Sequence, residues 1–322
     1  MKMKAFFVSF LLLFLSGCVF ITIPGVEPPA EKTIGGKGGN KVLLLDVSGI
    51  LKDDDSGGLL GVKSRPNLTA RIREELDLAA SDGSVRAVVL RINTPGGSVT
   101  TSDILAHEIE RFKKRKKVPV VAELMDMATS GGYYIASSAD IIIAEPTTVT
   151  GSIGVVAFSV NASGLLEKIG ITNQTIKSGA LKDMGSPLRP MTEEDRKVLQ
   201  SVIDGMYERF LDKVMEGRPG SFTRDELRAA ADGRIYTARQ ALDLRLIDSI
   251  GYLDDAIEAA KKAAGIKEAR IITYAHPRAY KNNIYSALAP SIGPSLPETL
   301  VINLDVGRLA DSGMHFMYMW LP

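Results

Sequence analysis

Short apolar runs alternate with longer amphipathic segments along most of this chain. The runs consist mainly of valine, leucine and isoleucine and are too short for ordinary helices, which indicates buried strands. We predict strands at residues 42–47, 85–92, 118–124 and 141–144, and helices at residues 68–80, 102–116, 130–136, 165–169, 193–215 and 224–231. This β–α–β–α order predicts a layered α/β fold with mostly parallel strands.

Two of the predicted helices carry clear local signals. Asn67 stands just before residues 68–80 and belongs to a residue type that caps helix N-termini. In residues 102–116 the large apolar side chains recur on one helical face; they are Ile104, Leu105, Ile109 and Phe112.

The N-terminus is typical of an export signal. Two lysines precede an apolar run at residues 5–15, and Leu15-Ser16-Gly17-Cys18 follows. A run of this length is shorter than the roughly 20 residues that cross a bilayer. The last four residues resemble the lipobox of bacterial lipoproteins, which implies a lipid on the thiol of Cys18 and removal of residues 1–17 as a signal peptide. The alternative is an uncleaved membrane anchor that continues to Ile23, and both interpretations place the rest of the chain outside the cytoplasm.

Composition changes sharply after the signal. Residues 24–40 contain three prolines and five glycines and cannot supply a core, so we predict a flexible tether over residues 18–40. We expect the folded domain to cover residues 41–265 and a C-terminal extension to cover residues 266–322.

Charge and residue counts exclude several kinds of function. The 322 residues include 39 basic and 38 acidic side chains, a net charge of +1 that gives no reason to expect nucleic acid as a partner. The basic run at residues 113–117 fits the end of a helix, where it complements the dipole, and the alternative is a phosphate or lipid patch. Cys18 is the only cysteine and the three histidines are scattered, so we expect no disulfide within the chain, no metal and no cofactor.

Two glycine-rich segments follow predicted strands and precede predicted helices. Gly96 and Gly97 permit unusual backbone angles and can aim free N–H groups at an oxyanion, although an ordinary tight turn has the same composition. Ser130 precedes another glycine pair at the start of a helix, where the helix dipole stabilises a developing anion. The alternative is that Ser130 only caps that helix.

A lysine in a third segment is a candidate general base. Lys182 lies within residues 177–187, among glycine, alanine, leucine and methionine. A lysine can accept a proton only when it is neutral, which requires burial or nearby dipoles, and these apolar neighbours can supply such a setting. The alternative, a lysine on a surface loop, fits Lys177 better.

These segments together resemble the signal peptide peptidases of the SppA type. Those enzymes are serine peptidases with the Clp protease and crotonase fold, a layered α/β fold of repeated β-β-α units with mostly parallel sheets. The resemblance extends over about residues 42–263. It rests on five stretches in the same order, namely Pro95-Gly96-Gly97, Ser130-Gly131-Gly132-Tyr133-Tyr134, Thr150-Gly151-Ser152-Ile153-Gly154-Val155, Lys182-Asp183 and Gly233-Arg234-Ile235-Tyr236-Thr237 with its continuation to Asp248.

The resemblance implies a role for each matching residue. Ser130 would attack the scissile carbonyl, and Lys182 would accept its proton. The backbone N–H groups of Gly97 and Gly131 would form the oxyanion hole, and Ser152 would orient the lysine. It also implies a membrane-tethered endopeptidase that cleaves apolar peptides, such as spent signal peptides, on the periplasmic side of the envelope. Short members form rings, so we expect a ring-shaped homo-oligomer in which the dyad can be completed between subunits.

Several alternatives remain open at this level. Thr129 and Arg245 depart from the family pattern, which often has alanine and glycine there, but neither is a dyad position. A triad would need His107, one helical turn from Asp103, which we expect to be a helix-surface side chain. A coenzyme A thioester enzyme conflicts with export from the cytoplasm, and a non-enzymatic membrane scaffold conflicts with the intact Ser130 and Lys182.

The C-terminus has an unexplained apolar segment. Six of the last seven residues, 316–322, are large and apolar, and such a patch usually marks a contact site. The segment either packs on its own domain or a neighbouring subunit, or lies in the substrate groove as a self-inhibitory plug.

Overall fold

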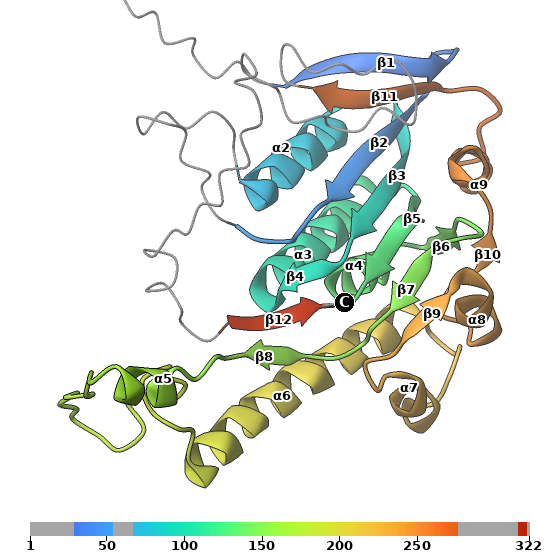
Figure 1. Cartoon of the computed structure of the whole chain (residues 1–322). Helices are drawn as coiled ribbons and strands as arrows, with labels where there is room; N and C mark the ends of the chain where they lie inside the picture. Colours follow the sequence, from blue (N-terminus) through green and yellow to red (C-terminus); the bar gives the residue numbers. More distant parts are fainter. Residues whose placement is uncertain (1–28, 54–66, 276–314, 321–322) are drawn as a thin grey trace, which may run out of the picture.

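The computed structural model describes residues 29–53, 67–275 and 315–320. Its main sheet has the strand order β1-β11-β2-β3-β5-β6-β10 (Figure 1). Within this path only the edge pair β1–β11 is antiparallel. The strands are β1 (Ala30–Gly36), β2 (Lys41–Ser48), β3 (Val85–Thr94), β5 (Val120–Thr129), β6 (Ile141–Ala144), β10 (Ser249–Ile250) and β11 (Arg270–Ala275).

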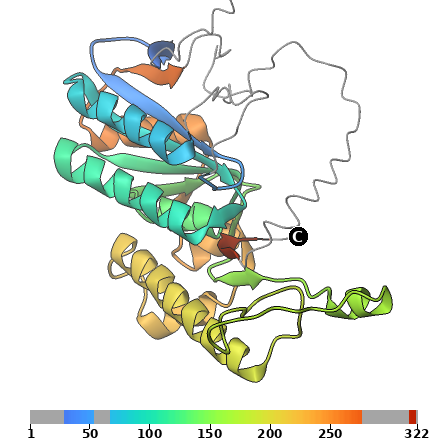
Figure 2. The same ribbon diagram turned by 90° about the vertical axis from the view of Figure 1, so that its left-hand side faces the viewer.

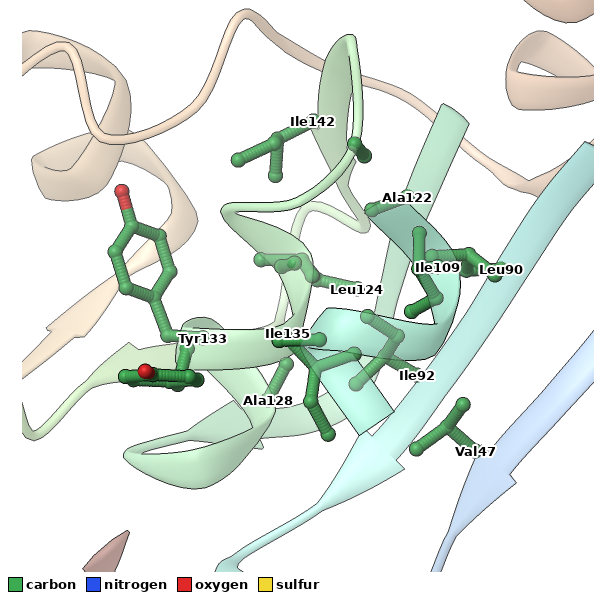
Figure 3. Packing of buried hydrophobic residues seen from close by; sticks show 14 of the residues in the cluster. Val47, Leu90, Ile92, Ile109, Ala122, Leu124, Ala128, Tyr133, Ile135 and Ile142 are labelled. Carbon is green, nitrogen blue, oxygen red and sulfur yellow. The ribbon is translucent and has the colours of Figure 1, made fainter. Parts of the chain in front are cut away.

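Helices cover both faces of this sheet. On one face lie α2 (Leu68–Ser81), α3 (Val99–Lys116) and α4 (Gly131–Ala136), and on the other lies α9 (Leu253–Ala263). Successive residues of β2 point to opposite faces: Leu43 joins the core under α2 to α4, whereas Leu44 joins the core under α9. Because both faces of the sheet are buried, the sequences of the central strands are almost continuously apolar. Figure 3 shows the packing of the larger of these two cores.

A second, three-stranded sheet lies beside the first. It contains β4 (Gly96–Ser98), β8 (Val156–Phe158) and β12 (His315–Met319), with β12 in the middle and antiparallel to both neighbours. Two further short strands, β7 (Val149–Gly151) and β9 (Ile235–Thr237), pair with each other, and β7 also continues the main sheet beside β5. The C-terminal strand therefore joins two segments that are distant from it in sequence.

One segment projects from the body of the protein. We call residues 159–192 the arm; they contain α5 (Ser163–Lys168) and lead into α6 (Glu193–Gly217). Figures 1 and 2 show the arm extending away from the sheets in both views. Its apolar side chains are unusually exposed, and Ile176 is 99% exposed. After α6 follow α7 (Arg224–Ala230) and α8 (Ala238–Asp243).

The predicted α/β fold is confirmed, with two boundary differences. Residues 30–36, which we expected within a flexible tether, form β1 on β11, and β11 itself lies beyond the expected domain end at residue 265. An edge strand needs backbone partners rather than an apolar pattern, which explains why composition missed β1. The signal sequence and Cys18 lie outside the described residues. Among the described helices, none combines the length and the apolar character needed to span a membrane.

Candidate active site

Ser130 occupies a strained turn between β5 and α4. Its φ of 52° and ψ of −113° lie outside the regions that non-glycine residues ordinarily adopt, and strain of this kind is concentrated at functional sites. The turn is held from both sides, since the Ser130 N–H donates to the Gly151 carbonyl at 2.7 Å and its carbonyl accepts from the Tyr134 N–H at 2.9 Å. The Ser130 side chain makes no capping hydrogen bond to α4. Ser130 is therefore the N-cap residue of α4 by position, but its side chain does not serve as the cap.

Ser152 lies next to this turn. Strands β5 and β7 are parallel, and their register pairs Thr129 with Gly151. Ser130 and Ser152 thus each directly follow the last residue of one of these two adjacent strands. Ser152 also has a positive φ, 51°, and its N–H donates to the Arg234 carbonyl at 2.7 Å. The fold brings these two predicted site residues to neighbouring positions.

The two glycine pairs meet beside Ser130. A Cβ atom added at Gly97 would lie 2.1 Å from the Leu51 carbonyl oxygen, and one added at Gly131 would lie 2.4 Å from the Ser102 hydroxyl. One added at Gly96 would lie 2.9 Å from the Gly131 nitrogen. No side chain fits at these distances: backbone approaches backbone at Gly96 and Gly97, and the Ser102 hydroxyl fills the space beside Gly131. This packing requires glycine and distinguishes the Gly96–Gly97 segment from an ordinary surface turn.

The C-terminal strand β12 lies along this glycine segment. Its register places Tyr318 opposite Gly97, and the Trp320 N–H donates to the Pro95 carbonyl at 2.9 Å. The Tyr318 carbonyl oxygen is so close that a Cβ atom on Gly131 would lie 3.1 Å from it. An extended peptide therefore already presents a carbonyl oxygen to the two glycines predicted to form the oxyanion hole.

A cavity of about 520 Å³ adjoins this strand. It is bordered by Ser152, by Tyr207 of α6, by Asp232 and by the last two described residues of the chain, Met319 and Trp320. Tyr207 is itself fixed, since its hydroxyl donates to the Ala231 carbonyl at 2.6 Å. The cavity thus lies beyond Tyr318, the residue that faces the glycines, and it leaves space beside Ser152.

Lys182 is not brought to Ser130 within one chain. It lies in a turn of the arm, is exposed, and donates its N–H to the Gly179 carbonyl at 3.1 Å. In residues 29–53, 67–275 and 315–320, no hydrogen bond or ion pair joins its side chain to Ser130 or Ser152. The neighbouring Asp183 is paired with Arg189 and Lys177, and these two cations hold its pKa below the usual range.

Two other features from the sequence are His107 and the basic run at residues 113–117. His107 is exposed on α3, while the nearby Asp103 accepts from the Tyr134 hydroxyl and from Arg209 at 3.0 Å rather than from the histidine. The basic run behaves as a helix end: Lys116 donates to the Asp82 carbonyl at 2.6 Å, and Lys113 pairs with Asp140 at 2.8 Å. The structure therefore gives no support to a histidine triad. In the basic run, Lys113 and Lys116 bind groups of their own domain.

Known proteins resemble most of this chain. The sequence model of peptidase family S49 matches residues 112–267, which include Ser130, Ser152 and Lys182. A protein of Enterococcus faecium named as a signal peptide peptidase SppA is 37% identical over 78% of this chain and 72% of its own length. A protein of Methanocaldococcus jannaschii named as a protease is 34% identical over 84% of this chain and 87% of its own length. The chain belongs to peptidase family S49.

Membership of family S49 confirms two expectations. The chain is an SppA-type serine peptidase, and its layered sheet has the Clp protease and crotonase-like fold. The chloroplastic serine protease SPPA of Arabidopsis thaliana is 32% identical over 73% of this chain, although the match covers only 35% of that longer protein. The S49 match does not support the coenzyme A and scaffold alternatives.

Sequence reasoning missed the pocket beneath β12. The Tyr318 side chain is fully buried between Tyr134 and Phe210. These residues lie far apart in sequence on β12, α4 and α6, so no local pattern joins them. The available signals were the adjacent Tyr133 and Tyr134, and a C-terminus in which aromatic residues alternate with methionine from Phe316 onward.

Proposed function

We propose that this S49 peptidase cleaves peptide bonds with a Ser130–Lys182 dyad. The Ser130 oxygen attacks the scissile carbonyl carbon while the neutral Lys182 amine takes the hydroxyl proton. The N–H groups of Gly97 and Gly131 stabilise the oxyanion, and Ser152 orients the lysine. The proton then passes to the leaving amine, and water hydrolyses the resulting ester to regenerate Ser130.

One observation carries this proposal. Strand β12 lies antiparallel to β4 with the Tyr318 carbonyl at Gly97 and Gly131, directly beside the strained turn of Ser130. A substrate bound in the same way adds a strand to the edge of β4, so that main-chain hydrogen bonds give affinity and pockets read the side chains. Its scissile carbonyl would then face both the nucleophile and the oxyanion donors.

We propose that the arm of a neighbouring subunit supplies Lys182. The arm projects from its own body, and its exposed apolar side chains include Leu165, Ile169 and Ile176. Contact with a second copy would cover these side chains and remove water from the lysine, which favours its neutral form. A head-to-tail contact of this type closes into a ring when the rotation between copies allows it.

The substrates we propose are apolar peptides, including spent signal peptides. The support is the apolar β12 sequence in the groove together with the name of the Enterococcus faecium relative. Lipid on Cys18 would hold the enzyme at the membrane surface outside the cytoplasm, where such peptides remain after export.

A fluorophosphonate probe tests the nucleophile. The purified full chain should be labelled at Ser130, as found by peptide mapping, and the Ser130→Ala variant should not be labelled. Ser152→Ala is the comparison variant: because Ser152 is proposed to orient the lysine, this variant should be labelled more slowly but still at Ser130. Labelling that persists in Ser130→Ala would refute the assignment.

Mixing two inactive variants tests the origin of the lysine. Ser130→Ala and Lys182→Ala proteins, combined under conditions of subunit exchange, should recover part of the hydrolytic activity because one copy contributes the serine and its neighbour the lysine. Mass spectrometry of differently tagged copies verifies the exchange. If exchange occurs and no activity returns, the dyad forms within one chain.

A further inference from the structure

The pocket under the carbonyl that faces Gly97 is aromatic and closed. The Tyr318 ring stacks on Tyr134 with centroids 5.1 Å apart and an interplanar angle of 27°, and it lies 4.7 Å from the Phe210 ring. Tyr134 and Phe210 also meet edge to face at 5.1 Å. The Tyr318 side chain has no exposed surface. Ring pairs of this geometry contribute more than their buried area alone.

The floor of this pocket is polar at one point. The Tyr318 hydroxyl donates to the Met206 carbonyl oxygen at 2.7 Å. Met206 lies one turn before Phe210 in α6, so its carbonyl also accepts within the helix and offers the tyrosine its second lone pair. A buried phenol is tolerated only where it finds such a partner.

The pocket wall is fixed from outside. The Tyr134 hydroxyl donates to Asp103 of α3, and Arg209 of α6 holds the same carboxylate at 3.0 Å. Burial and the neighbouring carboxylate raise the pKa of Tyr134, which keeps it protonated as the donor. The ring that stacks on Tyr318 is therefore clamped between two helices rather than free to change its rotamer.

We propose that this pocket selects tyrosine as the residue before the scissile bond and recognises its hydroxyl through the Met206 carbonyl. The proposal rests on the function proposed above, since it takes the Tyr318 carbonyl to mark the scissile position. It narrows the broad preference for leucine or alanine that an apolar groove alone would predict. Because the Met206 carbonyl keeps its helix bond, phenylalanine leaves no acceptor unpaired, so the preference for tyrosine should be modest, about two- to tenfold.

A peptide series on the full chain tests the selection. Four otherwise identical peptides carry tyrosine, phenylalanine, O-methyltyrosine or leucine at the position before the cleaved bond. The chain's own β12 competes equally with each of them, so ratios of kcat/KM are independent of that competition. We expect tyrosine to exceed phenylalanine by about fivefold. O-methyltyrosine should be the poorest aromatic residue, because it cannot donate and is longer. The same tyrosine-to-phenylalanine change two residues earlier should leave kcat/KM nearly unchanged.

Binding provides a readout that does not need turnover. In Ser130→Ala, a peptide that displaces β12 should release Trp320, the only tryptophan, and shift its emission. The tyrosine peptide should bind about fivefold more tightly than the phenylalanine peptide. If the tyrosine peptide bound fivefold more tightly but the wild-type enzyme cleaved neither peptide, the proposal of tyrosine selection would stand and the proposed Ser130–Lys182 mechanism would be refuted. Equal affinities and equal kcat/KM values would overturn the selection itself.

Two neighbouring tyrosines separate positioning from stability. Tyr134→Phe keeps the ring but removes its bond to Asp103, so the tyrosine-to-phenylalanine ratio should fall towards one. Tyr133→Phe loses a more deeply buried bond, from the Tyr133 hydroxyl to the Leu246 carbonyl at 2.7 Å, and should lose stability with the ratio unchanged. If both variants changed the ratio alike, the clamp would have no specific role in selection.

Discussion

The surroundings of Ser130 and of Lys182 differ in almost every physical respect. Ser130 is 1% exposed, lies in the turn between β5 and α4, and has backbone hydrogen bonds on both sides. Lys182 is exposed in a turn of the arm, and residues 171–180 of the same segment are also exposed. The body thus fixes the proposed nucleophile, whereas the arm only carries the proposed base.

The two regions also differ in how they reach left-handed backbone conformations. All described non-glycine residues with positive φ, among them Ser130, Ser152 and Arg245, lie in the body, whereas the arm uses Gly170 and Gly185 for this purpose. A packed core can impose strain on a side-chain-bearing residue because its neighbours over-determine the geometry. The comparison teaches that one chain already holds the strained turn of Ser130, whereas under the proposed function the environment of the base comes from a neighbouring copy.

The largest effect should come from the dyad itself. Ser130→Ala and Lys182→Ala should each lower kcat by at least about 10³-fold, and the double variant should be hardly worse, because the two groups act as one proton-transfer unit. The unfolding free energy of Lys182→Ala should not change, since the side chain is exposed. Peptide hydrolysis and urea unfolding measure both. A Lys182→Ala enzyme with near-normal turnover would break the comparison outright.

Glycines give the next test because the body and the arm use them differently. A Cβ atom at Gly97 meets the Leu51 backbone, so Gly97→Ala should lose about 3 kcal/mol of stability and most activity. Gly179 of the arm has nothing within 4 Å of such an atom, so Gly179→Ala should change stability by less than about 0.5 kcal/mol. Equal unfolding midpoints for the two variants would contradict the close backbone packing at Gly97.

Removing the C-terminal strand separates packing from inhibition. If β12 acts as a plug, truncation after Gly313 should lower KM for short peptides by about tenfold with the assembly unchanged, because a tethered competitor is gone. If the strand only packs, the truncated chain should lose stability or form a smaller oligomer, with no gain in affinity. Tyr318→Ala is the matched variant, since it keeps the strand but empties the pocket. An unchanged KM in an intact assembly would eliminate the plug.

Buried and solvated carboxylates should respond differently to pH. Glu123 on β5 is fully buried, and neither of its side-chain oxygens has a hydrogen-bond partner among the described residues; burial together with the charges of Glu145 and Asp255 raises its pKa to about 9. The folded state therefore keeps a proton that the unfolded state releases above about pH 4.5, so this residue makes the unfolding free energy fall as pH rises towards 9.

Glu123→Gln should remove that pH dependence. Relative to the wild type, the variant should gain on the order of 3 kcal/mol between pH 5 and pH 8 in urea unfolding. Asp183→Asn in the arm is the control: the pKa of Asp183 is lowered, so its contribution is lost only as the pH falls through the acid range, and no change of slope is expected between pH 5 and 8. Parallel slopes for Glu123→Gln and the wild type would contradict the raised pKa.

The smallest effect concerns backbone strain. Arg245 has a φ of 61°, so Arg245→Gly should relieve about 1 kcal/mol of strain and lose a similar amount to the greater freedom of the unfolded chain, for a net change within about 0.5 kcal/mol. In the arm, Gly185→Ala should cost about 1 kcal/mol because its φ is 78°. Thermal unfolding of both variants measures the difference, and a clear loss in Arg245→Gly would show that its side chain matters.

Most of the main sheet could be predicted from the sequence because its strands are buried on both faces. The expected strand at residues 141–144 coincides with β6, and the expected helix at residues 68–80 is α2 with Asn67 as its cap. The short strands β4, β7 and β8 could not be predicted, since three residues carry no periodicity and these strands exist only through their partners.

Part of the candidate site has a local mark in the sequence. Two glycine pairs and a serine between strand and helix pointed to the turn that the fold builds at Ser130. The departure at Arg245 now has a physical meaning, because the position adopts a left-handed conformation that glycine accepts without strain. The separation of Lys182 from Ser130 within one chain could be expected only through the family resemblance, which allows a dyad between subunits, since sequence spacing says nothing about the direction in which the arm leaves the body.

The middle strand of the β4–β12–β8 sheet comes from a different part of the chain than either neighbour. Without it, two facing rows of backbone donors and acceptors would be open at once, and open edges of this kind recruit stray chains and seed aggregation. A groove that binds peptide main chain therefore promotes aggregation whenever no strand fills it. The five residues of β12 cover both of these edges, so under the proposed function the segment that a substrate displaces is also the one that protects the edges from stray chains.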